Sequence, residues 1–200
     1  MRPKIYSDDR IFKSISTVLA KQGYEALTLQ KIAEQAGLSP AILSKRFGSK
    51  RGMLFAYYGH LIAVTRKSFD DLSKQSLPVT EALTEAFTQW HGFIKKPREL
   101  ANFMMLYLDL DIEPEFIGLS KERFLVIDAG VQAILREGIR RGEIRCPEVA
   151  GMSQVLQAAA TGASLIWIRD GEGVSPKERI ESCIRTILGD PAGGMNDRSG

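Results

Sequence analysis

The sequence predicts an all-α fold, in which three short N-terminal helices are joined by a long fourth helix to a larger helical C-terminal domain. Apolar residues recur at spacings of three and four along most of the 200 residues. No window shows the sustained alternation that is typical of strands. Glycines and small polar residues interrupt the pattern where helices should end and begin. We expect domains over residues 1–50 and 51–189, and a flexible tail over 190–200.

The first two helices are delimited by polar caps and glycines. Ser7 or Asp8 can cap the first, and Gly23 ends it. Thr28 can cap the second, and Gly37 ends that one. Each helix carries one apolar stripe, which predicts that it packs through a single face.

The next two helices follow in the same way. Ser39 can cap a third short helix, with Pro40 in its first turn and Gly48 at its end. Ser49 can cap the long fourth helix. Further helices are expected over about residues 80–95, 99–108, 121–141, 148–169 and 176–188. The acidic stretch 109–115 is expected to be a solvated turn.

Charge is unevenly distributed along the chain. The formal net charge is only +3, but residues 1–50 hold nine bases and four acids. The other 150 residues hold eighteen bases and twenty acids. This asymmetry favours a basic binding module on a near-neutral body. The two cysteines, Cys146 and Cys183, lie far apart, and without a signal peptide or a long apolar span we expect a cytoplasmic protein that does not enter a membrane.

The stretch 27–47 reads as a helix, a turn and a second helix. Gly37 permits the positive φ of a sharp turn, and the small side chains of Ala33 and Ala36 allow the two helices to approach closely. Leu43 and Phe47 would pack back onto the first helix. The spacing therefore predicts a helix-turn-helix unit whose second helix exposes its remaining side chains.

Such a helix suits the major groove of double-stranded DNA. Its N-terminal residues can contact the edges of the DNA bases. Lysine and arginine side chains near its end, and free N–H groups at helix starts, can bind phosphates. The residues expected to touch DNA are Thr28, Ser39, Pro40, Ala41, Ile42, Ser44, Lys45, Arg46 and Lys50.

The string Thr28, Ile32-Ala33, Ala36-Gly37-Leu38-Ser39, Leu43, Phe47 and Ser49-Lys50 resembles the signature of TetR-family transcriptional regulators. The resemblance covers residues 8–65. Four positions depart from the family pattern. Ala41 occupies a position where the family usually has Gly, and Ile42 one where Thr is common. Ser44 replaces a Tyr that usually touches the DNA phosphate backbone, and Arg51 replaces a frequent Glu. The resemblance implies DNA binding, with base preferences that differ from the commonest operators.

The resemblance also implies a homodimer, since the last two long helices of this family pair across a two-fold axis as a four-helix bundle. A two-fold dimer matches a palindromic operator. Candidate interface residues are Ala159, Ala163, Ile180, Ile184 and Ile187. The alternative is that both helices belong to the ordinary core.

A small-molecule effector is expected in the helical domain by the same resemblance. Its candidate lining is Trp90, Phe103, Met104 and Tyr107, although aromatic residues at helical spacing also suit a plain core. The predicted function is a ligand-responsive repressor. The alternative is a regulator controlled by a protein partner without an effector. Enzyme motifs, metal-ligand spacings and cofactor motifs are absent, so we expect no catalytic role, metal or cofactor.

Overall fold

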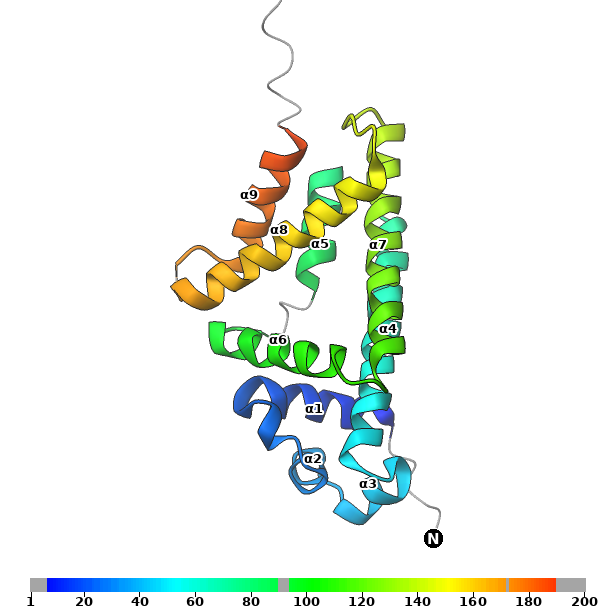
Figure 1. The fold of residues 1–200 in the computed structure, drawn as a ribbon, viewed down its shortest axis with the longest axis vertical. Helices are drawn as coiled ribbons and strands as arrows, with labels where there is room; N and C mark the ends of the chain where they lie inside the picture. Colours follow the sequence, from blue (N-terminus) through cyan, green and yellow to red (C-terminus); the bar gives the residue numbers. More distant parts are fainter. Residues whose placement is uncertain (1–6, 90–93, 172, 190–200) are drawn as a thin grey trace, which may run out of the picture. The chain divides into compact units, whose positions relative to one another are not determined.

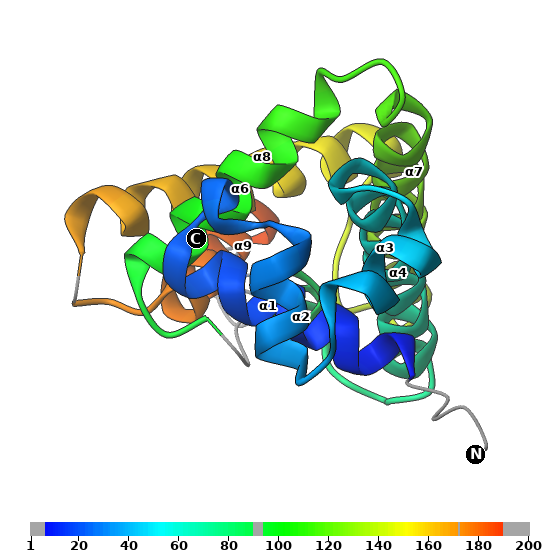
Figure 2. The same ribbon diagram turned by 90° about the horizontal axis from the view of Figure 1, so that it is seen from below.

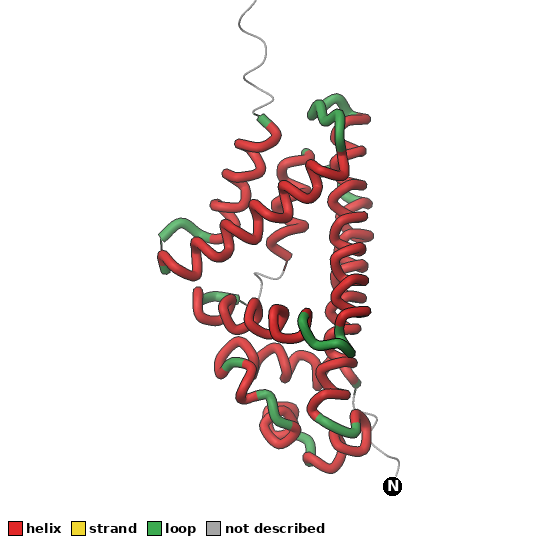
Figure 3. Tube along the Cα trace, viewed as in Figure 1, coloured by secondary structure: helices red, strands yellow, loops and turns green. Residues whose placement is uncertain are grey.

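The computed structural model describes residues 7–89, 94–171 and 173–189. Within these ranges every regular element is a helix, as Figure 3 shows, which confirms the predicted all-α class. The elements in chain order are α1 (Asp8–Gln22), η1 (Tyr24–Ala26), α2 (Leu29–Ala36), α3 (Pro40–Phe47), α4 (Lys50–Ser73), α5 (Val79–Thr88), α6 (Pro97–Asp111), α7 (Ile117–Arg140), α8 (Val149–Asp170) and α9 (Pro176–Leu188). In the described part of the chain, no helix is both long and apolar enough to span a membrane.

The chain divides into two compact units. Unit 1 comprises Met1–Val64 and Arg98–Glu122, and unit 2 comprises Thr65–Pro97 and Arg123–Gly200. Unit 1 therefore contains α1 to α3, the first part of α4 and nearly all of α6. It takes in more of the chain than residues 1–50, the DNA-binding domain expected from the sequence. The functional boundary at residue 50 remains a prediction, and the expected tail over 190–200 lies outside the described residues.

Unit 1 is built around the small N-terminal helices, which are drawn from blue to cyan in Figures 1 and 2. α1 packs on α2, and α2 packs on α3. Their shared core holds fully buried side chains from each helix and from α4: Ile11, Ile15, Leu19, Ile32, Leu43, Met53 and Leu54. Burial of this apolar surface is the main force that holds short helices together, because isolated helices of this length are marginal in water.

Polar bonds add α4 and α6 to unit 1. The Tyr57 hydroxyl on α4 lies 2.8 Å from the hydroxyl of Ser16 on α1. The Tyr58 hydroxyl donates to Asp111 at 2.8 Å, and the Asn102 side chain donates to the carbonyl of Ala20 at 2.9 Å. α6 is thus bound both to α4 and to the N-terminal helices.

Unit 2 has its own apolar core, to which α5, α7, α8 and α9 contribute. α9 packs against both α8 and α5. The core side chains include Leu83, Val131, Leu135, Leu156, Ala163, Ile180 and Ile184. A polar link crosses it where Asp128 of α7 accepts from Ser153 of α8 at 2.7 Å, and Ser153 is fully buried.

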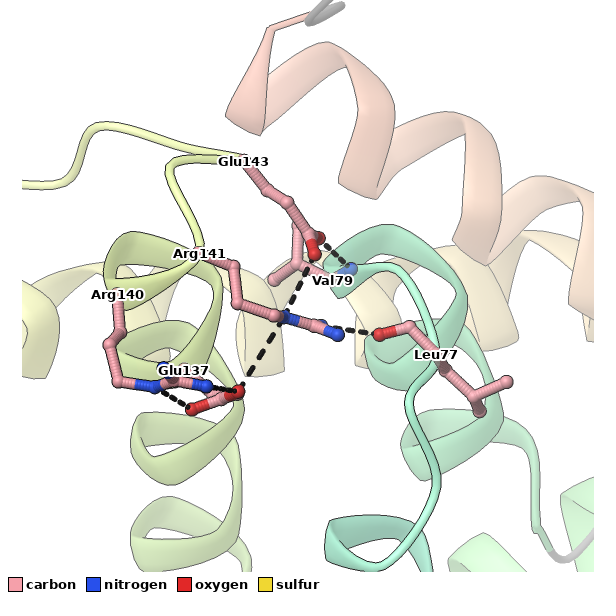
Figure 4. A network of polar contacts seen from close by, with 6 residues as sticks. All are labelled: Leu77, Val79, Glu137, Arg140, Arg141 and Glu143. Atoms are coloured by element: carbon pink, nitrogen blue, oxygen red, sulfur yellow. Dashed lines mark hydrogen bonds and ion pairs between the residues drawn. The ribbon is translucent and has the colours of Figure 1, made fainter.

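The end of α7 is tied to the start of α5 by the network in Figure 4. The Glu143 carboxylate accepts from the backbone N–H of Val79 at 2.6 Å and pairs with Arg141 at 2.9 Å. Arg141 in turn donates to the carbonyl of Leu77. This arrangement satisfies a free N–H at the start of α5, which no side chain of its own cap residue satisfies.

Several local expectations need correction. α6 begins at Pro97 and stays helical to Asp111, so the acidic turn starts later than expected. Its acids are also not simply solvated, because Asp111 accepts from Tyr58, and Glu113 binds Arg51. The local sequence suggests that these acidic side chains face solvent, because their partners lie more than fifty residues away in the chain and cannot be identified from it.

Candidate nucleic-acid interface

Local backbone chemistry fixes the turn between α2 and α3. The Thr28 hydroxyl accepts from the N–H of Lys31 at 3.1 Å, as predicted for an N-cap. Gly37 adopts φ 63° and ψ 41°, the left-handed conformation that glycine takes without strain. Its N–H donates to Glu34, and the next N–H donates from Leu38 to Ala33 at 2.8 Å. These bonds close the end of α2 in the manner of a Schellman turn.

The same glycine leaves room for a side chain from α1. A Cβ at residue 37 would lie 2.7 Å from a guanidinium nitrogen of Arg10. Sequence reasoning did not place Arg10 at this turn, because Arg10 lies 27 positions before Gly37 and shares no local motif with it.

α3 exposes most of the residues expected to read DNA. Leu43 is fully buried and Ile42 is half-buried, so the helix is anchored by one face. The exposed residues on this helix and its N-cap are Ser39, Pro40, Ala41, Ser44, Lys45 and Arg46. Pro40 occupies the first turn, as predicted. Ser39 holds the N-cap position, but contrary to expectation its hydroxyl makes no capping bond.

The first turn of α4 follows α3 closely in the sequence. Ser49 caps the helix, since its hydroxyl accepts from the N–H of Gly52 at 3.0 Å. The Lys50 ammonium lies 4.3 Å from the centroid of the Tyr24 ring and 3.5 Å from the Tyr24 carbonyl oxygen. Partial burial, together with Asp109 and Glu113, raises the pKa of Tyr24 above its ordinary value. The face of the Tyr24 ring holds this cation through a cation–π contact.

Two of the basic side chains in unit 1 are paired with carboxylates. An Arg46 guanidinium nitrogen lies 2.7 Å from the Asp8 carboxylate. Arg51 donates to Glu115 and, at 2.8 Å, to Glu113, and these bonds raise its pKa. The position that departs from the family's usual Glu is therefore a cation that binds the segment after α6. Sequence reasoning missed Asp8, Glu113 and Glu115 as partners of these cations.

The candidate effector residues differ in their burial. Phe103 is buried, while Met104 and Tyr107 are half-buried on α6, and Trp90 lies outside the described residues. The Tyr107 ring meets the Tyr58 ring edge-on, with centroids 5.9 Å apart. A surface pocket of about 250 Å³ occurs elsewhere, between α5 and α9. It is lined by Glu81, Thr84, Glu85, Lys177, Glu181 and Arg185.

The candidate interface residues fall into two groups. Ala163, Ile180 and Ile184 are buried in the core of unit 2, so their side chains pack against the chain's own helices. Ala159 and Ile187 are half-buried. The large apolar side chains that α8 exposes are different ones: Val155, Leu165 and Ile166.

The described residues contain no group of three or more acidic, histidine or cysteine side chains that could hold a metal ion. Cys146 is buried, and its thiol lies 3.4 Å from the carbonyl oxygen of Glu148.

The capped α2, the glycine turn and the exposed α3 define a helix-turn-helix protein. Residues 11–57 match the family described as bacterial regulatory proteins, tetR family. This match covers the N-terminal segment of the chain, and the fold of the whole chain is shared with a solved TetR-family regulator.

Two curated relatives are bacterial. The chain is 24% identical over 198 residues to YerO of Bacillus subtilis, an uncharacterized HTH-type transcriptional regulator, with 94% of this chain and 65% of YerO covered. It is 20% identical over 88 residues to BdcR of Escherichia coli, an HTH-type transcriptional repressor, with 44% and 45% covered. The chain thus spans less than two thirds of the length of either relative.

Solved structures share the fold. FadR of Bacillus subtilis in complex with stearoyl-CoA has a TM-score of 0.71 and 20% identity, covering 91% of this chain and 98% of that chain. FadR of Thermus thermophilus, a repressor in complex with lauroyl-CoA, has a TM-score of 0.58 and 21% identity, covering 97% of both chains. A TetR-family regulator from Rhodococcus has a TM-score of 0.69 and 18% identity, covering 90% and 98%.

Proposed function

We propose that this protein is a sequence-specific DNA-binding transcriptional regulator that acts in the cytoplasm as a homodimer on a palindromic operator. The observation that carries the proposal is the exposed face of α3. This face follows a capped α2 and a left-handed glycine, which is the geometry that presents a short helix to the major groove.

The residues of this face have separable roles. Ala41, Ile42 and Ser44 offer a small, mostly apolar surface with one hydroxyl, which suits thymine methyl groups and a single polar base contact. Lys45 is exposed and cationic, so it suits a phosphate. The free N–H groups at the starts of α2 and α4, near Thr28 and Ser49, suit phosphates too.

Selection of bound duplexes from a random library tests the proposal. One enriched palindrome is the expected result, and exclusively sequence-independent binding would contradict it. Lys45→Ala should weaken binding to all duplexes and lower the salt slope by about one, whereas Ser44→Ala should change base preference. Lys67→Ala is the matched control, because Lys67 lies on α4 in unit 2 and pairs with Asp71.

We place the dimer contact on the exposed stripe of α8, which carries Val155, Leu165 and Ile166 with Ala159 and Gly162 between them. These positions follow helical spacing, and their small members allow a second helix to come close. Ile166→Glu should shift the sedimentation of the dimer to that of a monomer. Val64→Glu, an exposed apolar residue of unit 1, is the control and should leave the dimer intact.

A small-molecule effector is proposed because two solved relatives of the same fold hold acyl-CoA. Such a ligand can release DNA only if it binds two states of the protein unequally. Lauroyl-CoA and stearoyl-CoA should therefore be titrated into the protein–operator complex. Release that is weakened by Tyr107→Ala would support an effector site at α6. Absence of release by these and other apolar ligands would favour control by a protein partner.

A further inference from the structure

A residue in the first turn of α1 forms an ion pair with a basic residue of α3, the helix proposed to read DNA. Asp8 is the first residue of α1, and Arg46 is the penultimate residue of α3. Their closest carboxylate and guanidinium atoms are 2.7 Å apart. Both residues belong to unit 1, so this contact lies inside one compact unit.

The guanidinium group binds carboxylates and phosphates through the same planar set of N–H donors. Arg46 cannot give its full donor set to both at once. The side chains of Arg46 and Asp8 are 35% and 46% exposed. The pair is therefore only partly shielded from solvent, and an ion pair with this exposure is weak enough to be exchanged.

We propose that Asp8 competes with DNA phosphates for Arg46 and thereby limits the sequence-independent affinity of the reading unit. The inference rests on the proposed DNA-binding function. When a phosphate takes Arg46, the Asp8 carboxylate is left close to the DNA backbone with its charge uncompensated. Asp8 thus lowers affinity for every duplex by competing for Arg46, and it contacts no base itself.

The effect should be visible in the salt dependence. Each phosphate neutralised by a protein cation contributes about −0.9 to the slope of log K against log salt concentration. A carboxylate beside the cation offsets one such contribution. Removal of the Asp8 charge should therefore steepen the slope by about one and tighten binding by about two- to fivefold, the range for a surface ion pair.

The experiment compares Asp8→Asn with Asp9→Asn, using the full chain and a fluorescent duplex of random sequence over a series of salt concentrations. Asp9 is the exposed neighbour in the same turn, so its variant makes the same change in net charge. We expect the Asp8 variant to bind more tightly and with a steeper slope than the Asp9 variant. The affinity for the enriched operator should rise by the same factor, because the competition does not depend on the base sequence.

Arg46→Gln completes the test. In that background Asp8→Asn should give no gain beyond Asp9→Asn, since the contested cation is gone. Equal effects of the two Asp variants would overturn the inference. So would weaker binding by Asp8→Asn, which would show that Asp8 orients Arg46 toward DNA. Ser7, the N-cap of α1, is kept in both variants, and Asp8→Ser removes the same charge without adding an amide, so it should reproduce the effect of Asp8→Asn. If the wild-type chain and all variants bind no duplex, the proposed function itself fails.

Discussion

Units 1 and 2 differ in how the surfaces proposed for DNA binding and dimerisation are specified. In unit 1 the exposed face of α3 follows from local features: the Thr28 cap, the left-handed Gly37 and a proline in the first turn. In unit 2, α8 carries apolar side chains on its buried face and also on its exposed face, as Leu156 and Leu165 illustrate. Turn chemistry therefore identifies the exposed face of a short helix directly, whereas an apolar pattern cannot distinguish a core face from an exposed apolar face.

The two units are alike in the contacts that join distant segments. Each has a core of fully buried apolar side chains, such as Leu43 in unit 1 and Leu135 in unit 2. Each adds hydrogen bonds, such as Ser16–Tyr57 in unit 1 and Ser153–Asp128 in unit 2. Variants in matched positions can sharpen or break this comparison.

The largest effects are expected from core truncations. Leu43 in unit 1 and Leu135 in unit 2 are both fully buried. Leu43→Ala and Leu135→Ala should each lower the free energy of unfolding by about 2–5 kcal/mol, as measured by urea denaturation. Under conditions where both variants remain folded, only Leu43→Ala should weaken duplex binding, because Leu43 anchors α3. Equal losses of binding would show that the units are not functionally separable.

The next largest losses of stability are expected where glycine is replaced by alanine at positions that other atoms approach closely. A Cβ at Gly52 would overlap the Phe47 carbonyl oxygen in unit 1, and a Cβ at Gly130 would overlap the Phe69 ring in unit 2. Gly130→Ala should cost about 1–3 kcal/mol through overpacking. Gly52→Ala should cost more, because a backbone carbonyl yields less readily than a side chain.

Gly59 in α4 is the control for these variants. A methyl group added there would meet no described atom within 4 Å beyond its own helix backbone and chain neighbours. Gly59→Ala should therefore stabilise the protein by about 0.5–1 kcal/mol through helix propensity. Thermal unfolding of all three variants checks the signs. A stable Gly130→Ala would mean that Phe69 can move without cost.

Tyr57→Phe tests the polar contacts of unit 1 and should cost about 1 kcal/mol at pH 7, because it removes the bond to Ser16. Burial raises the pKa of Tyr57 well above its ordinary value of 10.0. Its unfolded form therefore releases the proton first, and stability is lost as the pH rises above about 10. The Phe variant should lose less stability in that alkaline range. An identical pH profile in both proteins would argue against this burial.

The smallest effect is expected at the capping box of α9 in unit 2. The Glu178 carboxylate accepts from the Ser175 N–H at 2.9 Å, and this hydrogen bonding lowers the pKa of Glu178. Its contribution is present above the unfolded pKa near 4.5 and is lost as the pH falls through the lower folded value. Glu178→Gln should flatten this part of the acid profile. Glu181→Gln, a change of the same charge on the same helix, should leave it unchanged.

The sequence by itself determined the all-α class, the Thr28 and Ser49 caps, the glycines that end α1, α2 and α3, and the exposed face of α3. These features depend on interactions within a few residues, so spacing and residue type are sufficient to predict them. The same local reasoning placed Thr28, Ser49 and Pro40 correctly at helix starts. Ser7 and Ser39 hold N-cap positions without the capping bonds that their residue type suggests.

Only the tertiary structure decided which apolar faces are buried and which charges are paired. Ala163, Ile180 and Ile184 look like interface residues in sequence but lie in the core of unit 2. On α8 a second apolar face is exposed, whereas the apolar face of α9 is taken up by this core. The Asp8–Arg46 pair joins residues 38 positions apart. With 27 bases and 24 acids in the chain, sequence allows hundreds of such pairs, and only the packing of α1 against the other N-terminal helices selects this one.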